Sequence, residues 1–389
     1  DPHEERKPAP WADLSSKLDA WLNIEEQIEP PPWRKQLDGF GGADLPTTLH
    51  ITHSWGGGVE KWVHSFIEAD THCTHLQLRS EGPQTGEGYG QRFSLYLGTQ
   101  TQAPVASWWI QPAIHSTVVS HEQYREMLNR VLARYGIGRI IVSSLVGHSL
   151  DALDTDTPTI QVLHDFYPLW PLLGVNPTPY LAEGDSALKT ALRRHRLLPG
   201  FRDRSADSWK RVARDWRTRV SRRKVKVTAP SQSVMDMIRT LDEGWSDIDI
   251  KLIPHGLPRP DVPVEVLPRD RTDGRLRLVI PGRIQRGKGK HLLLEALPAL
   301  QEIAQVYLPS LLKSIGPHVA ALLSTVPETF SYTLSEMQHL NVPVIATRLG
   351  SFAERIIDGD TGWLIDPSPQ ALAERLRTLA CDRDAIDTV

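Results

Sequence analysis

The stretch TLHITHSWGGGVEKWVHSFI, residues 48–67, begins as a strand-like run, passes through a glycine-rich turn and ends in an amphipathic helical pattern. The strand-like run covers 48–52, the glycines occupy 56–58, and the helical pattern extends over 59–67. Strand, tight turn and helix in this order form the opening unit of an α/β domain. The stretch therefore predicts an α/β domain that begins near residue 46.

Short apolar runs alternate with helical patterns along the rest of the chain. Further strands are expected at 139–142, 159–163, 225–228, 250–253, 276–280, 319–323, 342–346 and 362–365. Helices are expected at 121–135, 233–241 and 332–340 and after Lys290. This alternation predicts parallel sheets that are covered on both faces, with ligands at the carboxyl ends of the strands.

The length and the composition shifts divide the chain into segments. With 389 residues, the chain exceeds one comfortable hydrophobic core, so two domains are expected. A proline- and charge-rich linker at 259–273 separates them. The predicted segments are an N-terminal extension (1–45), a first α/β domain (46–258) with a basic helical insertion (185–226), the linker, and a second α/β domain (274–389). We predict two Rossmann-like parallel-sheet domains that face each other across a cleft.

Bulk composition excludes several classes of protein. The 40% of hydrophobic and 23% of charged residues argue against disorder, and the net charge of -3 gives no overall sign of nucleic-acid binding. Cys73 and Cys381 are the two cysteines, too few for a disulfide framework. No run approaches the roughly 20 apolar residues of a membrane span, and the first residues lack the pattern of a signal peptide. The expected location is the cytoplasm.

Two cations follow the first strand of the second domain. Arg283 and Lys288 are placed at the carboxyl edge of the expected sheet, where a phosphate group would bind. Breaking the glycosidic bond of a nucleotide sugar releases a diphosphate, which needs cations and helix N-terminal amides to stabilise its charge.

Two glutamates lie further along the second domain. Glu328 precedes the expected helix and Glu336 lies within it. The loop and the first helical turn could present the Thr333 and Leu334 amides to phosphate. Glu336 could accept hydrogen bonds from both ribose hydroxyls.

Taken together, these motifs resemble family 4 of the retaining glycosyltransferases, which have the GT-B fold. The resemblance covers residues 47–380 and rests on Gly57-Gly58-Val59-Glu60, His164-Asp165, Leu252-Ile253-Pro254-His255-Gly256, Gly282-Arg283, Lys288-Gly289, Glu328 with Glu336, and Pro343 to Thr347 followed by Gly350, Glu354, Gly359, Thr361 and Gly362. It implies an acceptor-side first domain and a nucleotide-sugar donor domain at 274–389.

The resemblance also implies roles for individual residues. Glu328 would contact the donor sugar, and His164 would lie near the sugar and support an oxocarbenium-like transition state. The implied catalytic residues are His164, Glu328, Arg283 and Lys288. The implied donor-binding residues are Gly57, Gly58, Arg283, Lys288, Ser331, Thr333, Leu334 and Glu336. No metal and no cofactor besides the nucleotide-diphosphate sugar are expected, because the two cations take the role of magnesium.

The expected activity is that of a metal-independent, retaining hexosyltransferase. Its acceptor would be a glycan or a lipid-linked acceptor in bacterial O-antigen, lipopolysaccharide or capsule synthesis. Two alternatives remain open: a catalytically inactive GT-B scaffold that binds a glycan or a partner protein, and a nucleotide-sugar epimerase. A nucleic-acid partner is disfavoured, because the basic segment has no interleaved aromatic residues and no nucleic-acid-binding module is recognised.

The segment 189–226 is strongly basic. It predicts a face that meets an anionic membrane or a phosphate-bearing lipid-linked acceptor, at the inner face of the cell membrane. The alternative is a solvated helix pair whose charge is balanced by acidic regions elsewhere in the chain or by a partner subunit.

The second domain is shorter than the family pattern. Between Leu300 and Val319 the family has a further strand, helix and strand, whereas here Ala304 and Gln305 lead directly into Val306 and Tyr307. The sequence therefore predicts that some tens of residues are missing near 304–305.

Overall fold

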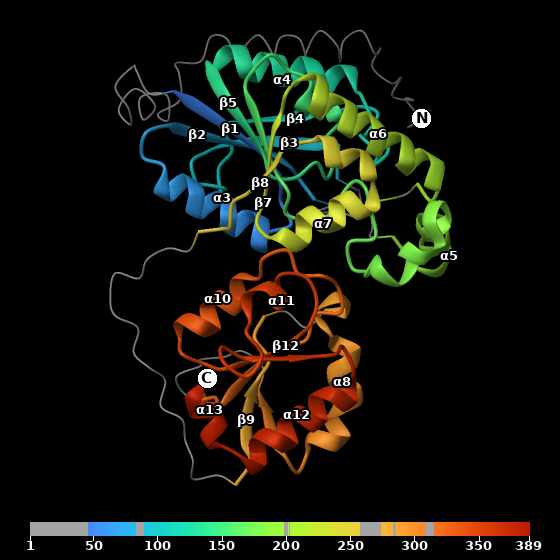
Figure 1. Ribbon diagram of the computed structural model, residues 1–389. Helices are drawn as coiled ribbons and strands as arrows, with labels where there is room; N and C mark the ends of the chain where they lie inside the picture. The colour runs from blue at the N-terminus through green and yellow to red at the C-terminus, as the bar shows by residue number, and fades with distance from the viewer. Residues whose placement is uncertain are drawn as a thin grey trace, which may run out of the picture. The chain divides into compact units, whose positions relative to one another are not determined.

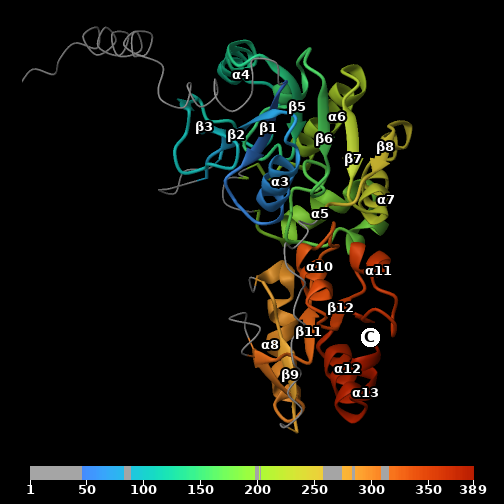
Figure 2. The same ribbon diagram turned by 90° about the vertical axis from the view of Figure 1, so that its left-hand side faces the viewer.

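The computed structural model describes residues 46–82, 89–197, 201, 203–256, 274–282, 285–307 and 315–389. We call residues 46–256 the N-terminal lobe and residues 274–389 the C-terminal lobe, because each contains one sheet (Figure 1, Figure 2). The predicted extension 1–45, the linker 259–273 and Arg283 lie outside the described residues.

The N-terminal lobe is built on an eight-stranded sheet. In spatial order its strands are β4 (Ala106–Trp109), β3 (Arg92–Leu97), β2 (Thr74–Ser80), β1 (Thr47–His53), β5 (Ile137–Val142), β6 (Thr159–Val162), β7 (Lys226–Ala229) and β8 (Ile250–Leu252). The strands from β2 to β8 pair in parallel, which confirms the predicted parallel sheet. The pairs β2–β3 and β3–β4 are antiparallel and were not predicted.

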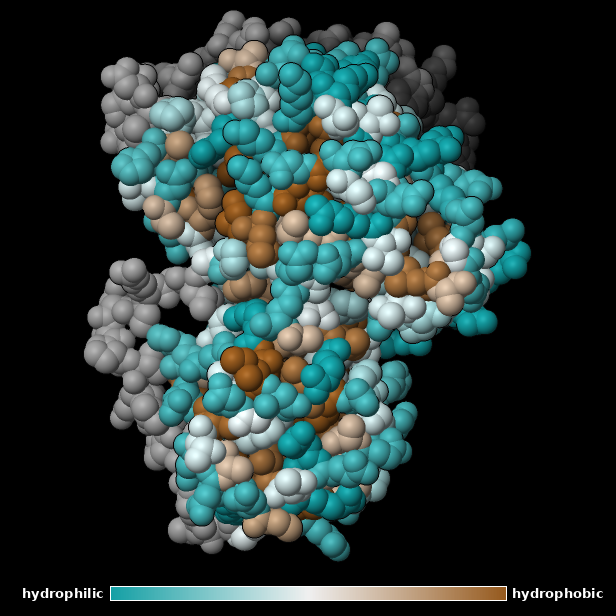
Figure 3. Space-filling view, in the orientation of Figure 1, coloured by the Kyte–Doolittle hydropathy of each residue, from teal (hydrophilic) through white to brown (hydrophobic). Residues whose placement is uncertain are grey.

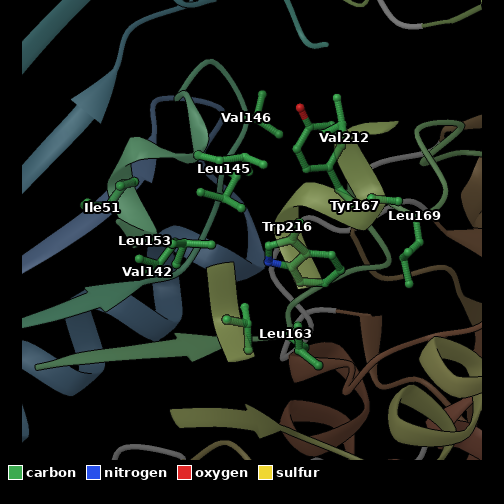
Figure 4. Close-up of a cluster of buried hydrophobic side chains, with 14 of the residues drawn as sticks. Ile51, Val142, Leu145, Val146, Leu153, Leu163, Tyr167, Leu169, Val212 and Trp216 are labelled. Atoms are coloured by element: carbon green, nitrogen blue, oxygen red, sulfur yellow. The ribbon is translucent and has the colours of Figure 1, made fainter. Parts of the chain in front are cut away.

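Five α-helices connect these strands: α3 (Gly58–Ala69), α4 (Glu122–Arg134), α5 (Ala187–Arg194), α6 (Ala206–Arg222) and α7 (Gln232–Leu241). The basic segment contains α5 and α6, which connect β6 to β7. Trp209 and Trp216 of α6 are fully buried, and the Trp216 indole donates to Gln161 Oε1 at 2.7 Å. Figure 4 shows Trp216 and Val212 among side chains of the sheet and its loops. The helix therefore packs on the lobe through one apolar face and exposes its basic face.

The C-terminal lobe has a five-stranded parallel sheet. In spatial order its strands are β10 (Ala304–Tyr307), β9 (Leu276–Val279), β11 (Val319–Leu322), β12 (Val344–Thr347) and β13 (Trp363–Ile365). The helices are α8 (Lys290–Leu300), α10 (Tyr332–His339), α11 (Ser351–Arg355), α12 (Pro369–Cys381) and α13 (Asp384–Thr388).

Both faces of the C-terminal sheet are covered. Leu278, Ala321 and Ile345 pack with α8 and α12 on one face. The alternate strand residues Val279 and Ala346 pack with α10 and α11 on the other. Because successive strand residues point to opposite faces, burial on both sides requires continuous apolar strands. This explains why β9, β11, β12 and β13 were recognisable as short apolar runs, whereas β10, with the sequence AQVY, was not predicted.

A missing segment was predicted near Ala304 and Gln305, which are the first two residues of β10. After α8 ends, β10 begins at Ala304 and pairs directly with β9, with Ala304 opposite Leu276 and Tyr307 opposite Val279. The absence of a segment near 304–305 stays a prediction. Among the described helices, none has both the length and the hydropathy needed to cross a membrane.

Candidate functional site

Lys288 lies at the carboxyl end of β9, in a short 3-10 turn that precedes α8. Gly289 ends this turn with φ of 80°, in the left-handed region. A Cβ atom on Gly289 would lie 2.0 Å from the Leu323 carbonyl oxygen, so only glycine fits. The turn thus places Lys288 beside Glu328, to whose carboxylate its ammonium group donates a hydrogen bond.

Glu328 follows β11 in the loop that leads to α10, and it is 8% exposed. Its backbone forms a bridge with Gly350, and its carbonyl accepts from the Ser351 N–H at 2.7 Å. Gly350 has φ of 62°, and a Cβ there would lie 2.3 Å from the Glu328 carbonyl oxygen. The close approach of these two backbone segments fixes the position of the Glu328 carboxylate.

The residue that caps the N-terminus of α10, Ser331, has an unusual backbone conformation. Ser331 has φ of 65°, and its hydroxyl accepts a hydrogen bond from the Leu334 N–H at 3.2 Å. The Arg355 guanidinium donates to the Ser331 carbonyl at 3.0 Å and to the Ser335 hydroxyl at 2.5 Å. Burial lowers the pKa of Arg355. These contacts hold the helix tip, and the Leu334 amide is already engaged in the cap.

One cavity of about 800 Å³ brings several of these elements together. Its wall in the C-terminal lobe includes Lys288, Glu328, Ser331 and Thr333, and its wall in the N-terminal lobe includes Gly57. The volume lies within the range of about 300–1,000 Å³ that small-molecule sites occupy. The cavity therefore contains a cation, a carboxylate and a helix N-terminus in one place, which suits a phosphate-containing ligand.

His164 follows β6 and lies next to this cavity. It lines a smaller cavity of about 190 Å³ together with Lys288 and Glu328. Its Nε2 is buried and has no hydrogen-bond partner among the described residues. Burial, followed by the neighbouring His255 and His53, lowers its pKa well below the ordinary value. The imidazole is therefore neutral at physiological pH.

Asp165 helps to shape the turn after β6. Its Oδ1 accepts from the Tyr167 N–H at 2.9 Å, as expected for an orienting residue. Burial raises its pKa to about 6. Across the lobes, the Thr329 hydroxyl donates to the His164 carbonyl at 2.9 Å, so the Glu328 loop and the His164 turn are directly connected.

Residues 302–386, which include Glu328 and Gly350, match the family described as Glycosyl transferases group 1. The matched residues all lie within the C-terminal lobe. No curated protein matches the sequence.

The solved structures that the chain resembles share its architecture. Anabaena HepE in complex with UDP has 14% identity and a TM-score of 0.51, with 88% of this chain and 92% of that chain covered. Sucrose-phosphate synthase from Thermosynechococcus elongatus has 13% identity and a TM-score of 0.54, with the same two coverages. A glycosyltransferase from Rickettsia africae ESF-5 has 16% identity and a TM-score of 0.50, covering 89% and 91%. At these identities the likeness establishes the fold, which is that of the GT-B glycosyltransferases.

Not all of the predicted site residues line the main cavity. Gly57, Lys288, Glu328, Ser331 and Thr333 line the main cavity. Among the described residues, Gly58, Leu334 and Glu336 were predicted to bind the donor but do not line this cavity. His164 lines the smaller cavity beside it. Leu334 is fully buried in the core of its lobe.

Glu336 has a partner in the opposite lobe. Its carboxylate forms an ion pair with Lys61 of α3, and Lys61 also lies 5.1 Å from the centre of the Tyr332 ring. The carboxylate of Glu336, which was predicted to bind the ribose, is therefore paired with Lys61, and the sequence did not predict this pairing.

Glu354 makes a second connection between the lobes. Its carboxylate accepts from the Gln232 N–H at 2.9 Å and from the Ser233 N–H at 2.5 Å, at the first residues of α7. A carboxylate at a helix N-terminus satisfies orphan amides and interacts favourably with the helix dipole. In the sequence, Glu354 stood out only as part of the motif that follows Pro343. No sequence signal indicated its contact with the N-terminus of α7.

An aromatic cluster surrounds His164. Its ring centre lies 5.2 Å from that of Trp62 and 4.9 Å from that of His255. His255 in turn lies 4.9 Å from Phe330 of the C-terminal lobe. Burial, followed by Arg355, lowers the pKa of His255 to about 4. The position of His255 just after β8 was a sequence signal for a site residue, because ligands bind at the carboxyl ends of strands. Trp62 lies within an ordinary helical pattern and carried no such signal.

Proposed function

We propose that this protein is a retaining glycosyltransferase that transfers a sugar from a nucleotide-diphosphate donor to an acceptor hydroxyl. The observation that carries the proposal is the cavity that joins Lys288, Glu328 and the α10 N-terminus to Gly57 of the opposite lobe. The match of residues 302–386 to the glycosyl transferases group 1 family supports it.

Lys288 would stabilise the departing diphosphate. Its ammonium group has three N–H donors, so it can bond to Glu328 and still donate to phosphate oxygens. The N-terminus of α10, where Ser331 and Thr333 line the cavity, would add the field of the helix dipole. By the family resemblance, Arg283 would act with Lys288 as a second cation, and metal independence is part of the same proposal.

Glu328 and His164 would face the transferred sugar. Glu328 is fixed through its backbone by Gly350, and His164 is neutral, so its Nε2 could bond to a sugar hydroxyl without adding charge. In the reaction the bond from the anomeric carbon to the diphosphate oxygen breaks, and a bond from that carbon to the acceptor oxygen forms. The acceptor oxygen attacks from the face that the diphosphate leaves, so the configuration is retained, and the acceptor proton passes to the departing phosphate.

Nucleotide binding provides the first test. We expect one of UDP, GDP, ADP and dTDP to raise the melting temperature, by an amount equivalent to about 2.7 kcal/mol at 100-fold the Kd. UDP is the first choice, because HepE, which is similar in fold, binds it. Incubation with UDP-glucose should then release UDP, and adding an acceptor should accelerate the release. The proposal fails if none of the four nucleotides changes the melting temperature. Conversion of the donor to an epimer without any transfer would instead support the epimerase alternative.

The acceptor class and the location are part of the proposal. We propose a glycan or a lipid-linked acceptor, as in bacterial O-antigen, lipopolysaccharide or capsule synthesis, at the cytoplasmic face of the membrane. A structure of the lipopolysaccharide outer core galactosyltransferase WaaB is similar in fold, with 12% identity and a TM-score of 0.50.

The basic helices supply a candidate membrane surface. Several of their cations are paired within the chain: Arg217 with Asp242, and Arg222 and Arg223 with Asp154. Figure 3 shows a largely hydrophilic surface over α6. The exposed cations of this segment that have no ion pair among the described residues are Lys189, Arg193, Arg194, Arg196, Arg204, Arg211, Arg214, Lys224 and Lys226. Each such residue adds about 1 kcal/mol near an anionic surface.

Liposome flotation tests this surface. We expect the protein to float with phosphatidylglycerol vesicles and not with phosphatidylcholine vesicles, and to be released as salt rises. The double variant Arg193→Glu/Arg196→Glu should lose flotation, whereas Lys251→Glu, an exposed lysine on β8, should keep it. Equal flotation with both lipids would remove the membrane proposal.

A further inference from the structure

An aromatic wall stands opposite the charged side of the main cavity. In the N-terminal lobe the cavity is lined by Trp55, Gly56, Gly57, Tyr89, Leu173 and Gly174. None of these described lining residues carries a charge. The cations and the carboxylate of the cavity all belong to the C-terminal lobe. The two sides therefore suit different parts of a ligand, an anionic part on one side and an uncharged part on the other.

The two rings of this wall are held in a fixed arrangement. The ring centres of Trp55 and Tyr89 lie 5.3 Å apart with an angle of 80° between the planes. His53 and Phe201 contact Trp55 from other sides, at 5.1 Å and 6.2 Å between ring centres. Tyr89 is 9% exposed, whereas Trp55 is only partly buried. The indole is therefore braced by its neighbours while part of its surface faces the cavity.

The backbone places Trp55 at this position. It comes two residues after β1 ends, and its N–H donates to His53 Nδ1 at 3.2 Å. Gly56 and Gly57 follow with φ of 74° and 77°, so the chain turns sharply into α3 immediately after the tryptophan. The turn leaves the backbone at Gly57 and the indole of Trp55 as adjacent parts of one wall.

Only certain ligands suit a braced indole in an uncharged wall. The face of an aromatic ring carries partial negative charge and attracts the C–H groups of an apolar surface. A sugar ring has such a C–H face, and its hydroxyl groups remain free at the edge for polar contacts. A phosphate group would find no cation on this side of the cavity among the described residues.

We propose that Trp55, braced by Tyr89, is the stacking platform for a sugar ring of the acceptor. The inference rests on the proposed function for the assignment of the charged side to the donor. It goes beyond that function, because it requires that the acceptor presents a sugar at the reacting end and that a bare lipid phosphate is not the acceptor group.

Ligand-observed saturation-transfer NMR on the full chain tests the proposal without needing turnover. The probes are the methyl glycosides of glucose, galactose, mannose and N-acetylglucosamine, with decyl phosphate as the non-sugar probe, each in the presence of UDP. We expect at least one glycoside to receive saturation on its ring C–H protons, and decyl phosphate to receive none that depends on Trp55.

Variants of Trp55 decide the assignment. Trp55→Leu keeps apolar volume and removes the ring, so glycoside binding should fall about tenfold, the upper range of an aromatic contact. Trp55→Phe should keep most of the binding. Trp109→Ala, at an indole that is 62% exposed on β4, is the matched control and should change nothing. The melting temperature of each variant and its rise with UDP show that the fold and the donor side are intact.

The outcomes separate this inference from the proposed function. Glycoside binding that Trp55→Leu leaves unchanged, or a wild-type protein that binds decyl phosphate and no glycoside, overturns the assignment of Trp55 while nucleotide binding still stands. If glycosides bind in a Trp55-dependent way but no nucleotide stabilises the protein, the proposed role of Trp55 stands and the proposed glycosyltransferase function fails.

Discussion

Replacing Lys288 by alanine is expected to reduce sugar transfer by a factor of about 10²–10³, the usual loss when one preorganised donor to a transition-state charge is removed. The ammonium group pairs with Glu328 and lines both cavities of the site. Its loss would remove the cation that we propose faces the departing diphosphate. It also leaves the Glu328 carboxylate, which is largely buried, to repel the same group.

Steady-state kinetics with UDP-glucose, or with the nucleotide sugar chosen by thermal shift, measure this effect. Because the Lys288 side chain is 53% exposed, the variant should lose little stability. Lys251→Ala, on an exposed edge strand, is the control for removing a surface lysine. If Lys288→Ala transfers sugar at the wild-type rate, the diphosphate does not bind at this lysine.

A double-mutant cycle shows whether the pair acts as one unit. Glu328→Gln removes the carboxylate charge while keeping its shape. If Lys288 both binds the diphosphate and neutralises Glu328, the double variant should lose less activity than the two single losses combined. Full additivity would mean that the two side chains act independently, against the arrangement seen here.

Gly350→Ala is expected to have the second large effect, on both stability and activity. Gly350 has φ of 62° and ψ of -139°, a backbone conformation that only glycine adopts readily, so an alanine there costs about 1–3 kcal/mol. A Cβ at this position would also lie 2.3 Å from the Glu328 carbonyl oxygen and 2.5 Å from its nitrogen. Overpacking of this kind adds about 1–3 kcal/mol. The Glu328 segment must shift, and a displacement of about 1 Å at a reacting group can cost about 100-fold in rate.

Gly359→Ala is the matched control. Gly359 also has a positive φ, 87°, but a Cβ there would have nothing within 4 Å. It should therefore show only the conformational cost of about 1–2 kcal/mol and keep its activity. Urea unfolding and the transfer rate of the two variants provide the comparison. Equal losses in both would mean that the contact between Gly350 and Glu328 is unimportant.

The sequence predicted those strands whose burial gives them a continuous apolar pattern. β9, β11, β12 and β13 of the C-terminal lobe were found because both faces of that sheet are covered, whereas the edge strand β10, which is only partly buried, was not predicted. β2 and β3 were missed because they bury polar side chains such as Gln77, Arg79 and Ser94. These groups have partners: the Gln77 amide donates to the Gly98 carbonyl, and Arg79 pairs with Glu60. Such partners come from other parts of the chain and leave no local signal.

The site was predictable where it depends on sheet topology. Lys288 and Glu328 follow two neighbouring parallel strands, β9 and β11, so their proximity followed from the strand order. The contacts of Glu336 with Lys61 and of Glu354 with α7 depend on how the two lobes pack, which spacing alone does not encode. Trp55 had a weak signal, since it lies between a strand and a glycine turn at a ligand-binding edge.

A crystal structure of the protein with its preferred nucleoside diphosphate tests the central claim most directly. We predict phosphate oxygens within about 2.7–3.2 Å of Lys288 Nζ, a normal hydrogen-bond distance, and next to Ser331 and Thr333 at the start of α10. A nucleotide bound elsewhere, with Lys288 contacting only Glu328, would contradict the account.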